Sequence, residues 1–137
     1  MKYVRLFLIA FFLIGAKAYS STPHAVLVNK LQSSLRYGRA EELALMFNNS
    51  VDLVIDSEDV DYTGITTSQA QLILKSFFKR NPPVDFQTIF QGDNGASTKY
   101  CTGLFKTAKD SFAVSVVMKK TSEGEFKIDS IRFKRER

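Results

Sequence analysis

Residues 66–83, TTSQAQLILKSFFKRNPP, divide this chain and constrain its fold more than any other segment. Apolar side chains recur there at i, i+3, i+4 and i+7, which is one face of an α-helix. The stripe consists of Ala70, Ile73, Leu74 and Phe77, widened by Leu72 and Phe78. Thr66 and Gln69 have the spacing of a capping box, and Pro82 and Pro83 end the helix because neither offers an N–H donor. A stripe this wide predicts that the helix packs against a sheet.

Two shorter helices and a strand hairpin are expected before this segment. Residues 23–37 have helical periodicity, and Gly38 suits a left-handed helix terminator. Residues 39–48 predict a second, shorter helix, with apolar side chains inward and two glutamates in its first turn. Residues 51–56 then alternate as a half-buried strand, and residues 61–65 are expected to pair back with it.

Four strands are expected after the long helix, separated by turn signals. They cover residues 84–91, 98–106, 111–120 and 125–134. In the first of these, alternation places Val84, Phe86, Thr88 and Phe90 on one face. In the last, the apolar phase slips near Asp129 and Ser130, which predicts a β-bulge. Successive hairpins of this kind predict a curved antiparallel meander, with the long helix packed against it as a lid.

The element order resembles the cone-shaped nuclear transport factor 2-like fold, an α+β architecture. The segments QLILKSFFKRNPP, VDFQTIFQG, KYCTGLF, FAVSVVMKK and FKIDSIRFKRE further resemble a family of small exported Bacteroidetes proteins, domain of unknown function 4783. The resemblance spans roughly residues 27–136. Its most specific parts are Phe77-Phe78 before Asn81-Pro82-Pro83, and the pattern Tyr100-x-x-Gly103. It implies the fold, export, and a pocket or dimer face between helices and sheet, but no catalytic residue.

The N-terminus has the pattern of a secretory signal peptide. Lys2 and Arg5 precede an apolar stretch at residues 6–16, and Ala16-Lys17-Ala18 is a small-x-small cleavage pattern. The apolar stretch is shorter than the ~20 residues that a membrane span needs. We therefore expect residues 1–18 to be removed, leaving a single domain at 19–137 that is periplasmic or secreted and has no transmembrane segment. An uncleaved N-terminal anchor is the alternative.

Net charge does not favour a nucleic-acid partner. The chain has 19 Lys and Arg against 14 Asp and Glu, but Lys2, Arg5 and Lys17 lie in the expected signal peptide. The remainder has 16 basic and 14 acidic residues, a net charge of +2. A basic cluster ends the chain: Lys127, Arg132, Lys134, Arg135 and Arg137. A solvated strand face accounts for this cluster, and an acidic partner or anionic surface is the alternative.

Few residues point to catalysis. With one His, one Cys and no Gly-rich phosphate loop, the sequence predicts neither a metal site nor a cofactor. Cys101 lies in an apolar strand pattern, which predicts a buried thiol. Proton transfer, as in an isomerase or dehydratase, is an alternative function, and it would need a base and a hydrogen-bond donor. The available bases are Asp52, Asp56 and Asp85, and the donors are Tyr37, Tyr62 and Tyr100. Alternation places the three carboxylates toward solvent.

Aromatic residues favour a non-catalytic binding module, for a small apolar ligand or an envelope protein. The predicted pocket under the lid helix is lined by Phe77, Tyr100, Phe112 and Phe126, with Thr102 as a polar contact. The alternative is that these aromatics fill the core. A further alternative is an interaction domain that pairs with a second copy through the outer face of the sheet. Val117, Phe105 and Ile89 are expected to be exposed there.

Overall fold

The computed structural model describes residues 23–136, and the long predicted helix is α4 (Thr67–Arg80). Thr66 is its N-cap. The Thr66 hydroxyl accepts a hydrogen bond from the Gln69 N–H at 3.2 Å, and the Gln69 side chain accepts from the Thr66 N–H at 3.1 Å. These reciprocal bonds satisfy two N–H groups that the first turn leaves free, and they confirm the predicted capping box. The expected signal peptide lies outside the described residues.

The helical hairpin before α4 forms, but its second helix is shorter than expected. Helix α2 (Pro23–Arg36) ends two residues before Gly38, whose φ of +62° fits the predicted left-handed terminator. Helix α3 (Ala40–Ala44) stops well before residue 48, so the predicted range 39–48 is wrong at its end. The early end of α3 is due to a contact with a residue distant in sequence. The Met46 carbonyl accepts a hydrogen bond from Ile128 N–H at 2.7 Å, which draws the chain into a strand.

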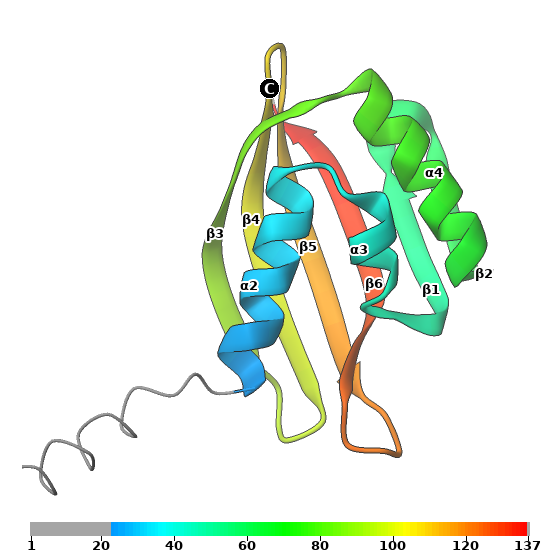
Figure 1. Cartoon of the computed structure of the whole chain (residues 1–137), viewed down its shortest axis with the longest axis vertical. Coiled ribbons are helices and arrows are strands. Elements are labelled where there is room, and N and C mark those ends of the chain that lie inside the picture. The colour runs from blue at the N-terminus through cyan, green and yellow to red at the C-terminus, as the bar shows by residue number, and fades with distance from the viewer. Residues whose placement is uncertain (1–22, 137) are drawn as a thin grey trace, which may run out of the picture.

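Six strands form one sheet, in the order β2-β1-β6-β5-β4-β3 (Figure 1). The strands are β1 (Phe47–Ile55), β2 (Val60–Thr66), β3 (Pro83–Asp93), β4 (Thr98–Thr107), β5 (Ser111–Lys120) and β6 (Phe126–Glu136). The predicted β1–β2 hairpin and the four-stranded meander are both confirmed. The sequence did not predict that the hairpin and the meander belong to one sheet. Strand β1 pairs in parallel with β6, and this pairing joins them.

The predicted bulge in the last strand is also present. Val117 pairs with Ser130, but the next residue, Met118, pairs with Ile128, so Asp129 is an extra residue in β6. The bulge lets Ile128 and Ile131 both be fully buried, although their spacing breaks strict alternation.

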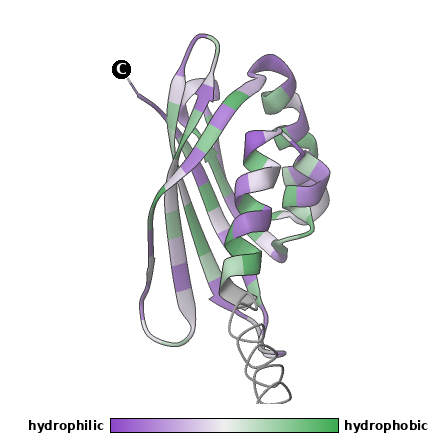
Figure 2. Ribbon diagram, turned by 60° about the vertical axis from the view of Figure 1, so that its left-hand side comes forward, coloured by the Kyte–Doolittle hydropathy of each residue, from purple (hydrophilic) through white to green (hydrophobic). Residues whose placement is uncertain are grey.

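The core lies between the sheet and the three helices, which all cover the same face of the sheet (Figure 2). Phe77 of α4 is at its centre and is fully buried. Its ring centroid lies 4.9 Å from that of Phe133, 5.4 Å from that of Phe112 and 6.0 Å from that of Phe105. The wide stripe of α4 therefore packs on the sheet as predicted. No helix within residues 23–136 is long and apolar enough to cross a membrane.

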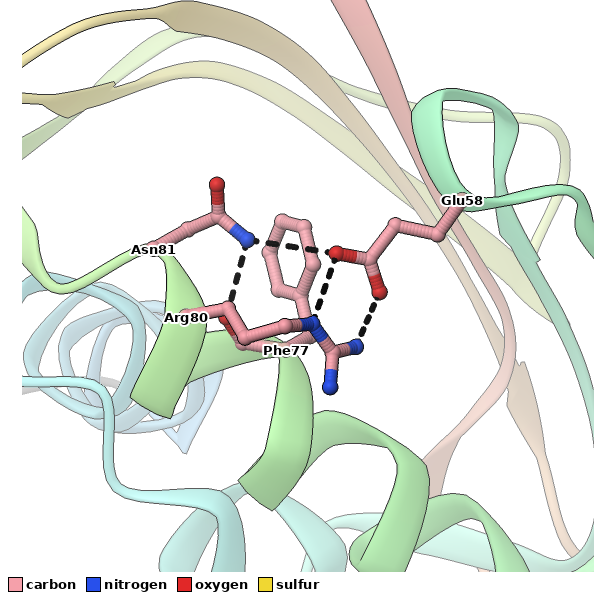
Figure 3. A network of polar contacts seen from close by, with 4 residues as sticks. All are labelled: Glu58, Phe77, Arg80 and Asn81. Carbon is pink, nitrogen blue, oxygen red and sulfur yellow. Dashed lines mark hydrogen bonds and ion pairs between the residues drawn. The ribbon is translucent and has the colours of Figure 1, made fainter.

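A polar network fixes the C-terminal end of α4 to the β1–β2 hairpin (Figure 3). Glu58 lies in the 3-10 turn η1 (Asp56–Glu58). Its carboxylate accepts from two of the Arg80 guanidinium nitrogens, Nε and Nη2. The Asn81 Nδ2 amide donates to the Phe77 carbonyl at 3.0 Å and to Glu58 Oε2 at 3.4 Å. The Phe77 carbonyl also accepts from the Asn81 backbone N–H at 2.8 Å, so the Asn81 side chain is its second donor and ties the helix end to Glu58.

Candidate ligand-binding groove

A groove of about 1000 Å³ lies between helices α2 and α3 and one end of the sheet. That end is at the bottom of Figure 1, where the β3–β4 and β5–β6 turns lie. Apolar side chains from α2, from the α3–β1 junction and from β6 form much of its lining: Val26, Leu27, Leu45, Met46 and Phe126. Leu45 is 77% exposed and Val26 is 40% exposed, so this end of the fold leaves apolar surface open to a ligand.

Charged side chains surround this apolar surface and are mostly cationic. The groove is lined by four lysines and two glutamates, namely Lys30, Lys99, Lys120, Lys127, Glu42 and Glu125. Their formal net charge is therefore +2. The chain outside the expected signal peptide also carries a net charge of only +2. The positive charge of the groove is therefore local and does not reflect a uniformly basic surface.

Two of these lysines pack closely against the groove wall. The Lys99 ammonium lies 5.1 Å from the Phe126 ring centroid, which is within cation–π range. It also pairs with Asp93, at 3.8 Å. The Lys127 ammonium donates to the Leu45 carbonyl at 3.3 Å and lies 3.9 Å from the Glu125 carboxylate. These contacts hold the two lysine side chains against the groove wall, where Lys99 is 21% exposed and Lys127 is 32% exposed.

The structure does not bring the five predicted pocket residues together. Phe77 and Phe112 are fully buried and pack on each other in the core. Phe126 is the member of the five that lines the groove. Tyr100 and Thr102 alternate with the buried residue Cys101, so they lie on the uncovered face of the sheet.

The outer face differs from the prediction in two residues. Phe105 was expected to be exposed there, but it is fully buried, because β4 turns Cys101 and Phe105 toward the helices. Phe90 was expected to share a face with Phe86. A register shift between Thr88 and Phe90 instead leaves Phe90 half exposed, stacked on Tyr100 at 5.8 Å between centroids.

The other two residues predicted to be exposed on the outer face, Ile89 and Val117, are both at least partly exposed. Ile89 is 69% exposed, and Val117 is partly exposed beside its cross-strand partner Tyr100. Phe90, Tyr100 and Val117 make an apolar outer patch, and the exposed Ile89 is next to Phe90 in the sequence.

Sequence reasoning missed the groove lysines of the sheet, although the pattern contained a signal for them. Strict alternation along β5 buries Phe112, Val114, Val116 and Met118. Two residues beyond Met118, the same face continues to Lys120, and two residues before Cys101, the inward face of β4 begins at Lys99. An inward-facing lysine at the end of a strand, where the core has stopped, indicates the edge of a cavity.

The carboxylates considered as catalytic bases have structural partners. Asp52 accepts from the Gly64 N–H at 2.8 Å, and Asp56 accepts from the Arg135 N–H at 3.1 Å. The Asp85 Oδ1 lies 3.3 Å from Arg36 Nε, an ion pair between β3 and α2. None of the three lines the groove, and neither do Tyr37, Tyr62 and Tyr100.

Cys101 is buried, as predicted. Burial raises the pKa of its thiol, against the opposing effect of a hydrogen bond with Thr88. A thiol of this kind stays protonated at neutral pH and is a poor nucleophile. Within residues 23–136, no three His, Cys, Asp or Glu side chains are grouped so that they could hold a metal ion.

Solved structures share this arrangement of helices on one face of a curved sheet, which is the nuclear transport factor 2-like fold. An NTF-2 like protein of unknown function from Silicibacter pomeroyi DSS-3 superposes with a TM-score of 0.59 at 12% identity, over 81% of this chain and 91% of that chain. A DUF4783 family protein from Bacteroides uniformis ATCC 8492 gives 0.72 at 21% identity, over 80% and 96%. One from Bacteroides ovatus ATCC 8483 gives 0.71 at 21% identity, over 79% and 94%.

The family model of the domain of unknown function DUF4783 matches residues 28–134, and the chain belongs to this family. Among proteins with curated functional descriptions, none matches the chain.

Proposed function

We propose that this protein is an exported, non-catalytic binding module that holds a small, largely apolar ligand in the groove between α2, α3 and the sheet. The observation that carries the proposal is the groove itself. Its volume of about 1000 Å³ is at the upper end of the ~300–1000 Å³ that small-molecule sites occupy, and its apolar lining is incompletely buried.

The distribution of carboxylates supports binding rather than catalysis. Proton transfer needs a base in a dry cavity with a perturbed pKa. The two carboxylates that line the groove, Glu42 and Glu125, are both exposed, and Glu42 pairs with Arg39 at 3.3 Å. The groove thus offers apolar contact and positive charge without a buried base.

Binding can be measured with N-phenyl-1-naphthylamine, a neutral apolar dye that fluoresces when it leaves water. We expect a saturable rise in fluorescence, which weakens several-fold in Leu45→Gln. Leu72→Gln is the matched control, because Leu72 is 66% exposed, lies on α4 and does not line the groove. Absence of saturable binding to the folded protein would overturn the proposal.

The export part of the proposal rests on the N-terminal sequence. If residues 1–18 are a signal peptide, the protein recovered from the producing cell has the mass of a chain that begins at Tyr19. Intact mass spectrometry of the native protein measures this directly. A mass that includes Met1 and the apolar stretch would instead support the uncleaved anchor.

The outer patch favours a second function, pairing of two copies through the uncovered face of the sheet. Ile89 and Phe90 are more than half exposed, and the Phe90 ring stacks on Tyr100 without being covered. Light scattering after size exclusion tests this alternative. A dimer that becomes a monomer in Phe90→Ser, but not in Leu72→Ser on the helical face, would support it, and a monomeric parent protein would exclude it.

A further inference from the structure

We propose that the ligand of the groove is an amphiphile: an apolar chain that ends in an anionic head group, which binds between Lys99 and Lys120 beside Phe126. This inference rests on the proposed function of the groove. It adds the chemical class of the ligand and the two side chains that select it.

The register of the sheet places both lysines around one aromatic ring. Lys120 of β5 is the cross-strand partner of Phe126 in β6, and the Lys99 ammonium lies over the Phe126 ring at 5.1 Å. Lys99 itself pairs with Met118, two residues from Lys120 on the same face of the sheet. Diagonal neighbours of this kind are ~7–8 Å apart, within reach of long side chains. Two ammonium groups can therefore converge on one anion.

Neither lysine forms a short ion pair with a carboxylate among the described residues. Among the described residues, no carboxylate lies within ion-pair distance of Lys120. Lys99 has Asp93, but that pair is long at 3.8 Å, and the Asp93 side chain is 64% exposed. A long pair with an exposed carboxylate contributes little to stability, so a ligand anion can replace Asp93.

The apolar lining continues from this cationic end toward the helices. Phe126 lies beside the lysines, and Leu27, Leu45 and Met46 extend the lining along α2 and the α3–β1 junction. An extended hydrocarbon chain can lie along these side chains while its head group stays at the lysines. A wholly apolar ligand would leave the two ammonium groups unused, and a cationic one would be repelled by them.

Displacement of the bound dye distinguishes these ligands. We would compare dodecanoate, dodecyl phosphate, dodecanol and dodecyltrimethylammonium, all below micelle formation, on the full chain as the host cell processes it. An anionic head group should lower the displacing concentration about tenfold relative to dodecanol, which corresponds to one charge-assisted contact. The preference should shrink as salt is added, because Lys120 is exposed to solvent and its interaction with the head group is screened. Whichever of the two anions displaces better identifies the head group.

Two double variants test the assignment of the lysines. Lys99→Gln with Lys120→Gln should abolish the preference for the anion while dodecanol still displaces the dye. Lys106→Gln with Lys109→Gln removes the same charge from exposed positions outside the groove and should keep the preference. Equal displacement by dodecanoate, dodecyl phosphate and dodecanol would overturn this inference alone. Failure of the dye and all four amphiphiles to bind would overturn the proposed function as well.

Discussion

The Phe86 ring lies directly against the backbone of Gly103 on the neighbouring strand. A Cβ atom at position 103 would meet Phe86 Cζ at 2.3 Å and the Gln87 carbonyl oxygen at 2.7 Å. Real Cβ atoms do not approach other atoms so closely, and one of the two obstacles is backbone. The glycine in the Tyr100-x-x-Gly103 pattern thus makes room for an aromatic ring of β3.

Gly103→Ala is therefore expected to lower the free energy of unfolding by about 1–3 kcal/mol, as overpacked cores do. Chemical denaturation measures this loss. Ser115→Ala, at an exposed position on the adjacent strand β5, is the control and should stay within about 0.5 kcal/mol of the parent. An unchanged free energy of unfolding in Gly103→Ala would contradict this account, because it would mean that Phe86 and β3 shift away from position 103 without cost.

Thr66→Ala should cost about 1 kcal/mol, because it removes the hydroxyl that accepts from Gln69 N–H at the start of α4. Thr66→Ser keeps the hydroxyl and should retain most of the stability. Ser68, two residues later, lies inside the helix and is exposed, so Ser68→Ala should have little effect. Equal losses at positions 66 and 68 in thermal denaturation would argue against the capping box.

Phe77→Ala is expected to cost about 3–5 kcal/mol, since it leaves a cavity at the meeting point of four other phenylalanine rings. Leu72→Ala on the exposed side of the same helix should change stability by less than about 0.5 kcal/mol. If Phe77→Ala does not fold, Phe77→Leu gives a smaller loss that urea denaturation can still resolve. A loss in Phe77→Leu no larger than that in Leu72→Ala would contradict this account of the core.

Cys101 should make stability decline in alkaline solution. Its pKa is raised in the folded state by burial, while the unfolded thiol titrates near ~8.5. Above that pH the unfolded state has lost a proton that the folded state keeps, so the free energy of unfolding falls as pH rises toward the folded pKa.

The decline due to this thiol is at most about 1.4 kcal/mol per pH unit, and Cys101→Ala should remove it. Urea denaturation of both proteins between pH 7 and pH 10 measures the difference, because other titrating groups cancel. Identical pH profiles would refute the assignment. A thiol reagent at neutral pH should also react slowly until denaturant is added.

Local sequence signals predicted much of the fold. The cap at Thr66, the terminator at Gly38 and the bulge at Asp129 each depend on a few neighbouring residues, so short patterns suffice to find them. The parallel pairing of β1 with β6 was not predictable in this way. It joins residues as distant as Ile55 and Phe133, and nothing near either strand encodes the partner.

The faces of β4 show why the site was harder to predict than the fold. Tyr100 and Thr102 on one side, and Cys101 and Gly103 on the other, are about equally apolar, so alternation alone does not decide which side is buried. The choice depends on Phe86, whose ring occupies the space above Gly103. The groove was missed because aromatic residues were taken as its lining, whereas the aromatics largely fill the core and lysines occupy the open end.

The central position of β6 has a consequence for how the chain acquires its structure. Strand β6 follows the other five strands in the sequence and lies between β1 and β5, so without it β2-β1 and β5-β4-β3 are two separate sheets, each with an unprotected edge. Contacts across such sequence distances form slowly. The sheet is therefore complete only after residues 126–136 are free to insert, and until then its unpaired strand edges are open to aggregation and to capture by chaperones.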